Sequence, residues 1–473
     1  MIKNNPNRYI VWLGIAAFLF LVSLTSLVIS PHLDTDYLDG FMAWEDGDLY
    51  FNRANNLNGS FVFFHYAGYV SFTPQLLTYL FSFLPYLLQS FCYALTALLA
   101  GLWMFYQLAA ILVDAGIHRR LAYVVALATA AYLHIVCQEF YLNLTFAMWS
   151  ALIGASIYVV RIALAGAKPH WFATLLATLS FASHPLAVAS LPVIGAGLCL
   201  RRAQLKAFIP HAIALVLGIL LVVAGTEVSK NAASLHSLFE TLPPGLAALL
   251  HLNALAMVRV DLSIVVMLAA ITAGLIRLPG LIKSGSAKAA AILAGSLFLI
   301  PVYLALFLAS GRFTLNDVSD DGRYFTPIVA FAILALMVSF AQTPRLAALG
   351  QRLEGFSRTP AYVFLAVCLV LSLTAGPMIF WKYYANRLQF LAAAQCLGEN
   401  GLTDFAITAQ NYDQTLAIAK GPRHFGLSAT GLFIDIKPSP EPLAELQHFC
   451  PGVQPSYGQA VQNGHVWIGT RAF

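Results

Sequence analysis

A dense acidic cluster follows the first hydrophobic segment and contains the side chains best suited to proton transfer. Six carboxylates fall within fifteen residues, in a chain in which 10% of residues are charged. Ionisable groups crowded beside a membrane are costly, so such a cluster indicates a functional site. The alternative is a solvated acidic loop with no chemical role. The six residues are Asp34, Asp36, Asp39, Glu45, Asp46 and Asp48.

Two later polar segments carry cations that could bind an anionic group. Lys230 and Arg259 lie in segment 225–261, and Arg323 lies in segment 310–327. A guanidinium matches phosphate oxygens with paired donors, so Arg323 is the first candidate for a phosphate. The alternative is an arginine that only anchors the end of a membrane span.

The apolar segments contain almost no ionisable residues. His134 is interpreted as a hydrogen-bonded packing residue, and His184 beside Pro185 as a kink or helix-end residue. A transporter or proton pump would place charges or broken helices near the membrane midplane. The distribution therefore disfavours that class.

The composition indicates an integral membrane protein. Of 473 residues, 59% are hydrophobic, and the mean hydropathy is +0.75. The net charge of +5 does not indicate nucleic-acid binding, because the basic residues sit in short loops and form no basic aromatic stripe. The six cysteines show no C-x-x-C metal spacing.

Apolar runs bounded by charge predict an all-α membrane protein with eleven spans. The fifth and sixth are shorter than a straight crossing of about 17 residues, so one span kinked at His184 is an alternative. Merging them would put Lys168 and Arg202 on opposite sides, so we keep eleven. The spans are 9–30, 86–113, 121–137, 144–163, 171–183, 186–200, 207–224, 262–279, 289–309, 328–342 and 360–380.

The basic loops predict the orientation of the chain. With a cytoplasmic N-terminus, the inner loops hold most of the Lys and Arg residues, as the positive-inside rule requires. The acidic cluster and both later polar segments then lie outside the cytoplasm. We expect a transmembrane domain over 1–380, including a first external loop at 31–85, and an extracytoplasmic C-terminal domain over 381–473.

The C-terminal segment has the pattern of a small α/β domain. Residues 383–400 have helical spacing, and 403–412, 415–421, 431–438 and 464–473 read as short strands separated by turns. Cys396 and Cys450 could close a disulfide in an oxidising compartment, but the sequence does not show that they meet.

Two motifs resemble the GT-C superfamily of membrane glycosyltransferases. "DGDLYFNRANNL" is similar to the motif after the first span, with Asp46, Tyr50, Ala54 and Leu57, and "SFTPQLLTYLFSFLP" suits a helix at the membrane interface. "GRYFTP" is similar to the Arg-Tyr-x-x-Pro sequence before a late span. The family has Glu after the Asp where this chain has Gly47. The matching residues of the second motif are Arg323, Tyr324 and Pro327.

The resemblance implies an inverting hexosyl- or pentosyltransferase that moves a sugar from a polyprenyl-phosphate donor to a glycan or lipid acceptor. A carboxylate would take the acceptor proton, and cations would stabilise the departing phosphate. Asp46 is the first candidate base, followed by Asp48 and Asp36. The implied substrate-binding residues are Arg323, Tyr324, Tyr50 and Arg259.

Several points stay open at this stage. The acids could hold Mg²⁺ or Mn²⁺, whose preferred ligands are hard oxygens. The expected location is the bacterial inner membrane, and the expected role is in polysaccharide assembly for the cell envelope. The alternative functions are a flippase for lipid-linked saccharides and a scaffold subunit that has lost its chemistry.

Overall fold

The computed structural model describes a helical bundle and a small sheet. Helices are the expected elements, because a backbone in an apolar medium must satisfy its hydrogen bonds within the segment. The described residues are 6–29, 62–63, 70–84, 86–137, 144–201, 204–224, 262–309, 325–341, 343–355, 367–368, 370, 405–408, 433–436, 460–462 and 465–469.

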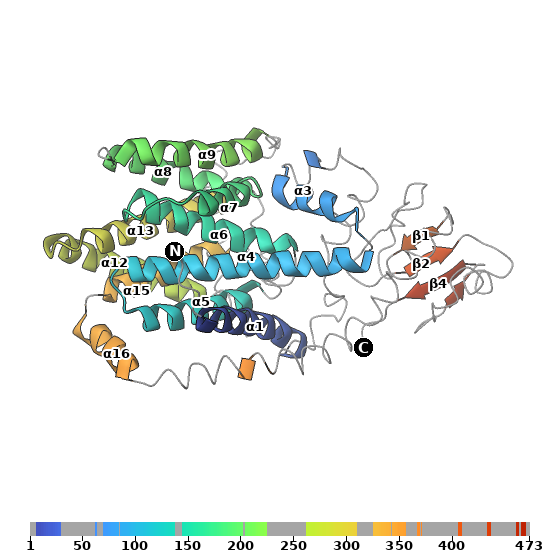
Figure 1. Ribbon diagram of the computed structural model, residues 1–473, viewed down its shortest axis with the longest axis horizontal. Coiled ribbons are helices and arrows are strands. Elements are labelled where there is room, and N and C mark those ends of the chain that lie inside the picture. The colour runs from blue at the N-terminus through green and yellow to red at the C-terminus, as the bar shows by residue number, and fades with distance from the viewer. Residues whose placement is uncertain are drawn as a thin grey trace.

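The long helices of the bundle are shown in Figure 1. Four described helical segments are long and apolar enough to cross a membrane: Cys92–Asp114, Leu205–Ala224, Leu262–Lys283 and Ala287–Leu306. The elements are α1 (Pro6–Ile29), α3 (Phe72–Phe81), α4 (Tyr86–Asp114), α5 (Arg119–Cys137), α6 (Leu144–Ala163), α7 (Trp171–Phe181), the 3-10 helix η5 (Pro185–Ser190), α8 (Leu191–Leu200), α9 (Leu205–Ala224), α12 (Leu262–Lys283), α13 (Ala287–Ala309), α15 (Thr326–Phe340) and α16 (Pro344–Gly355).

The described helices match the predicted segments in position. Each predicted span from the first to the tenth contains a helix, and the boundaries of α6 agree with the predicted 144–163. The eleventh, 360–380, lies outside the described residues except for 367, 368 and 370. The structure therefore supports a membrane protein, and the number eleven stays a prediction.

Side-chain contacts assign the helix ends to two faces of the bundle. Arg161 near the end of α6 contacts Asp114 at the end of α4, and the guanidinium of Arg277 in α12 lies 6.0 Å from the ring of Phe340 at the end of α15. At the other end, the Tyr132 hydroxyl of α5 lies 3.0 Å from the Ser263 hydroxyl of α12.

Apart from Arg8 in α1, every Asp, Glu, Lys and Arg of the described helices and their short connections lies toward the first of these ends, which we call the basic face. The other end is called the opposite face. The charged residues at the basic face are Asp114, Arg119, Arg120, Arg161, Lys168, Arg201, Lys206, Arg277, Lys283, Lys288, Arg345, Arg352 and Glu354.

The segment from α7 to α8 is a hairpin. At its start, the backbone N–H of His170 donates to the Tyr158 hydroxyl of α6 at 3.2 Å. At its end, Nε of Arg201 donates to the carbonyl of Ala163, the last residue of α6, at 3.1 Å. Both ends therefore lie at the basic face, so the alternative of one kinked span is wrong, because such a span would end at the opposite face.

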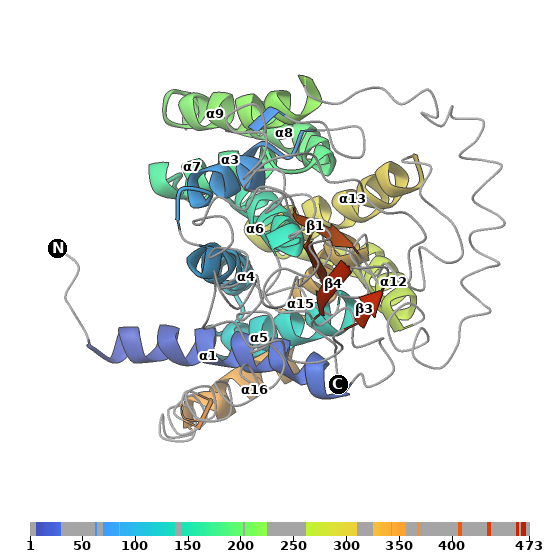
Figure 2. The same ribbon diagram turned by 90° about the vertical axis from the view of Figure 1, so that its right-hand side faces the viewer.

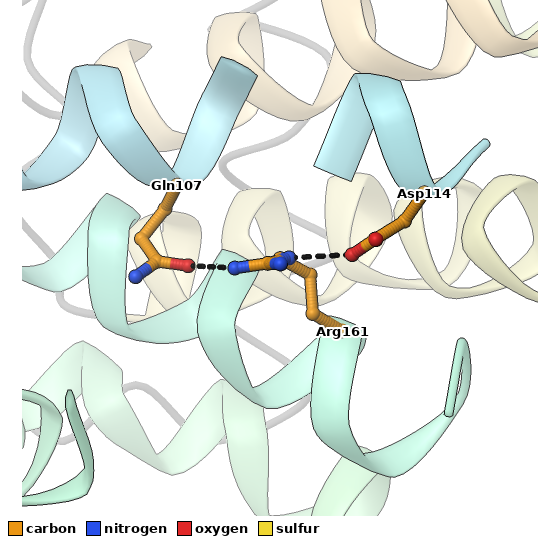
Figure 3. Close-up of polar contacts among 3 residues, drawn as sticks. All are labelled: Gln107, Asp114 and Arg161. Atoms are coloured by element: carbon orange, nitrogen blue, oxygen red, sulfur yellow. Dashed lines mark hydrogen bonds and ion pairs between the residues drawn. The ribbon is translucent and has the colours of Figure 1, made fainter. Parts of the chain in front are cut away.

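A charged contact joins α4 and α6 at the basic face (Figure 3). Nε of Arg161 donates to Oδ2 of Asp114 at 2.7 Å, and Nη1 donates to Oε1 of Gln107 at 2.8 Å. The Arg161 and Asp114 side chains are 14% and 27% exposed. Since α4 and α6 run in the same direction, this contact fixes their relative register.

Small residues allow close packing between neighbouring helices. A Cβ on Gly154 would lie 2.5 Å from Cδ1 of Trp103 in α4, and a Cβ on Gly218 of α9 would clash with the Thr178 carbonyl oxygen of α7. Helices in lipid gain little from the hydrophobic effect between them, so close backbone approach provides much of their cohesion.

Four short strands near the C-terminus form an antiparallel sheet in the order β1-β2-β4-β3. β1, β2 and β4 lie within predicted strands, and β3 was not predicted. The predicted strand at 415–421 and the helix at 383–400 lie outside the described residues, so the α/β domain stays a prediction. The strands are β1 (Phe405–Thr408), β2 (Phe433–Ile436), β3 (Ala460–Gln462) and β4 (His465–Gly469).

We predict that Asp114→Asn destabilises the bundle by about 2 kcal/mol, between the values for exposed and fully buried pairs, because it leaves the Arg161 charge without its counter-ion. Unfolding by titration with a denaturing detergent measures the loss. The double variant Asp114→Asn/Arg161→Gln should lose less than the sum of the single losses. Additive losses would mean that the two side chains do not interact.

Candidate functional site

The residues predicted to carry the chemistry lie outside the described residues. The chain neighbours of two of the segments that contain them are described. The acidic segment lies between the end of α1 and the start of α3, and Arg323 precedes α15. The helices that follow these segments, α3 and α15, both begin at the opposite face. The predicted site residues are Asp36, Asp46, Asp48, Tyr50, Arg259, Arg323 and Tyr324.

The helix that follows Arg323 and Tyr324 begins inside the bundle. Phe325 is 4% exposed and Thr326 is fully buried. Pro327 lies in the first turn, where its fixed φ suits a helix start and its missing N–H costs nothing. Arg323 lies outside the described residues, two positions before Phe325 in the chain.

α15 is a central helix of the described bundle. It packs against α4, α5, α6, α12 and α13, and Figure 2 shows it among them. Eleven of its fifteen residues are buried. α15 is therefore a central helix of the bundle, and the role of Arg323 before it stays a prediction.

α3 follows the acidic segment in the chain and is hydrogen-bonded to the tip of the α7 hairpin. The N–H of Phe72 donates to the carbonyl of Ala182 at 3.0 Å. The Thr73 hydroxyl donates to the carbonyl of Leu179 at 2.6 Å. The Ser71 hydroxyl donates to the carbonyl of Ser183 at 2.7 Å. The Leu179 carbonyl also accepts from the Ser183 hydroxyl at 2.9 Å, so these three bonds attach α3 to the last turn of α7 and to the two residues Ala182 and Ser183 that follow it.

α3 buries polar residues and exposes apolar ones. Gln75 and Thr78 are fully buried, whereas Leu80 is 52% exposed and the following Phe83 is 69% exposed. α4 is seen nearly end-on in Figure 2, whereas α3 lies across the view. Both features fit the predicted helix at the membrane interface, with its apolar side toward lipid.

His184 has a structural role at the hairpin tip. It caps η5, with Nδ1 accepting from the N–H of Leu186 at 3.2 Å. Because Nδ1 accepts, the proton of the neutral ring is on Nε2. The ring packs against Trp149 at 4.3 Å between centroids, and the residue is 5% exposed. The helix-end role predicted for His184 is confirmed.

The described part of the chain has no group of three His, Cys, Asp or Glu side chains that could hold a metal ion. The acidic segment is not in that part, so a role for Mg²⁺ or Mn²⁺ stays open. Cys396 and Cys450 also lie outside the described residues, so their disulfide stays untested.

No family model, curated protein or solved structure matches the chain. The likeness to membrane glycosyltransferases therefore depends on the two short motifs and on the order of the elements around them.

Sequence reasoning missed the contacts between α3 and α7. The signal available was the run Ser71-Phe-Thr73 before the proline of α3, since Ser and Thr hydroxyls often bond nearby backbone groups. Their partners are more than 100 residues away, at Ser183 and Leu179. Such pairings cannot be read from local spacing.

We predict that Ser71→Ala/Thr73→Val frees α3 from the hairpin tip. Two hydroxyl-to-carbonyl bonds are lost, at about 1 kcal/mol each, so amide hydrogens of α3 should exchange about 30-fold faster. Hydrogen exchange with mass spectrometry measures the change. Thr343→Val is the matched control, because the Thr343 hydroxyl bonds only the nearby Phe340 carbonyl among the described residues. Unchanged exchange in α3 would contradict the prediction.

Proposed function

We propose that the protein is an integral membrane glycosyltransferase of the inverting GT-C type. It moves a sugar from a polyprenyl-phosphate donor to a surface glycan or lipid acceptor. The reaction takes place at the opposite face, which is the extracytoplasmic face in this proposal. The basic face is then cytoplasmic, in agreement with the positive-inside rule.

The observation that carries the proposal is the buried start of α15. The motif Arg323-Tyr324 directly precedes Phe325 and Thr326, which are buried in the centre of the bundle. The acidic segment ends at α3, which is attached to the same bundle by three hydrogen bonds to the α7 hairpin. Both motifs thus precede helices that begin at one face, as a shared site requires.

The apolar surroundings of this face suit a donor with a lipid tail. Leu80 and Phe83 at α3 are exposed, and the described helices place no charged residue at this face. A polyprenyl chain can remain in lipid beside such a surface, while its sugar phosphate meets the charged segments. The energetic reason is that burying an apolar chain in lipid costs nothing, whereas burying a phosphate without cations is costly.

The proposed chemistry divides the work between one carboxylate and one guanidinium. Asp46 takes the proton from the acceptor hydroxyl as that oxygen attacks the anomeric carbon. The bond from that carbon to the phosphate oxygen breaks, and Arg323 stabilises the charge on the departing polyprenyl phosphate. Tyr50, Tyr324 and Arg259 complete substrate binding, and Asp48 and Asp36 are the alternative bases.

We predict that Asp46→Asn lowers sugar transfer by about 10²- to 10⁴-fold, the usual contribution of a general base. The measurement is transfer from a radiolabelled polyprenyl-phosphate sugar to membrane acceptors, in membranes with equal amounts of each variant. Asp39→Asn is the matched control, since it removes an acid from the same segment outside the motif. Full activity of Asp46→Asn would exclude Asp46 as the base.

We predict that Arg323→Gln lowers transfer by about 10²- to 10³-fold, as expected when one donor to a developing anion is removed. Arg312→Gln, in the same polar segment, should retain activity. A wild-type protein that moves lipid-linked sugar across liposomes and never transfers it would support the flippase alternative. A wild type that does neither would support the scaffold alternative.

A further inference from the structure

α16 differs from the other described helices in composition and length. Its twelve residues, PRLAALGQRLEG, mix leucines with arginines, whereas α15 before it is almost entirely apolar. Twelve residues of helix span about 18 Å, which is too short to cross a bilayer. The helix follows α15 at the basic face and packs against α5; Figure 1 shows it beside the bundle.

Three residues spaced three apart along α16 have three different environments. Leu346 packs against the hydrophobic core, Leu349 is 44% exposed, and Arg352 is exposed. Residues three apart on a helix are separated by about 60° around the axis, so the three face the protein, then an apolar exterior, then a charged exterior. This order fits a helix lying flat where acyl chains meet headgroups.

The charges on α16 and at the start of α5, the helix it packs against, are predominantly positive. Arg119 at the start of α5 is exposed, and its guanidinium lies 5.7 Å above the ring of Tyr123. The acids of the described helices are Asp114 and Glu354, and Asp114 is held by Arg161 at 2.7 Å. One carboxylate therefore accompanies four arginines on α16 and at the start of α5: Arg119, Arg120, Arg345 and Arg352.

We propose that α16 and the start of α5 form a binding surface for anionic phospholipid at the basic face. Arg119 and Arg352 bind the headgroup phosphates, and Leu349 inserts among the upper acyl carbons. A neutral zwitterionic lipid offers the same acyl chains and lacks the net negative charge, so the surface discriminates by charge. The inference is independent of the glycosyltransferase proposal, because it uses the face remote from that site.

The test is a lipid titration of the full-length chain in a maltoside detergent. Dioleoyl-phosphatidylglycerol and dioleoyl-phosphatidylcholine are added separately, and the shift in melting temperature gives an apparent affinity for each. We expect tighter binding of phosphatidylglycerol. Each basic residue near an anionic surface contributes about fivefold in affinity, so Arg119→Gln/Arg352→Gln should weaken phosphatidylglycerol binding about 30-fold.

Lys283→Gln/Lys288→Gln is the matched control. It also removes two positive charges from exposed residues of the basic face, at the connection between α12 and α13. This variant should retain the preference for phosphatidylglycerol over phosphatidylcholine. Equal affinities of the wild type for the two lipids would overturn the proposal, and so would an equal loss in both double variants.

Two further measurements on the wild type do not depend on a variant that folds. Raising the salt concentration from 0.1 to 1 M should reduce the preference, because it shortens the screening length from about 10 to 3 Å. Glycerol phosphate, which has the anion without the acyl chains, should fail to displace phosphatidylglycerol. A salt-independent preference, or displacement by glycerol phosphate at equal concentration, would contradict binding of a lipid by charge and insertion together.

Discussion

The exclusion of charge from the apolar interior determines how this chain is arranged. Apart from Arg8 in α1, every charged residue of the described helices lies toward the basic face. The closest approach to an exception is Arg161, which is 14% exposed and meets Asp114 and Gln107 at hydrogen-bonding distance. A charge this far from water is tolerated only with a partner, which Asp114 provides. The contact also joins α4 and α6 at the boundary between the interior and the basic face.

Cohesion inside the bundle comes from close packing and from hydroxyl groups. Ser156 in α6 lies 2.7 Å from the Tyr303 hydroxyl of α13 and 3.2 Å from the Ser190 hydroxyl of η5, all buried. This network attaches the hairpin tip to the helices around α15. Since α3 is bonded to the same hairpin and Tyr303 stacks on Phe331 of α15, the two helices that follow the motif segments belong to one continuous set of contacts.

The sequence predicted the helices well because apolar runs bounded by charge have few alternatives in lipid. It also predicted, from Lys168 and Arg202, that both ends of the α7 hairpin lie at the same face. It could not predict the contacts of Ser71 and Thr73, because their partners are fixed by tertiary packing. β3 was missed because three residues show no clear alternation. The residues proposed for catalysis remain a prediction from motif and position.

The proposed function requires the acidic segment and the Arg323 segment to lie on the same side of the membrane, away from the basic loops. Single cysteines at positions 48, 323 and 283 in a cysteine-free background, labelled with a membrane-impermeant maleimide in intact cells, test this requirement. Labelling at 48 and 323 without permeabilisation, and at 283 only after it, is the predicted result. Labelling at 323 only after permeabilisation would separate the guanidinium from the carboxylates and contradict the proposed site.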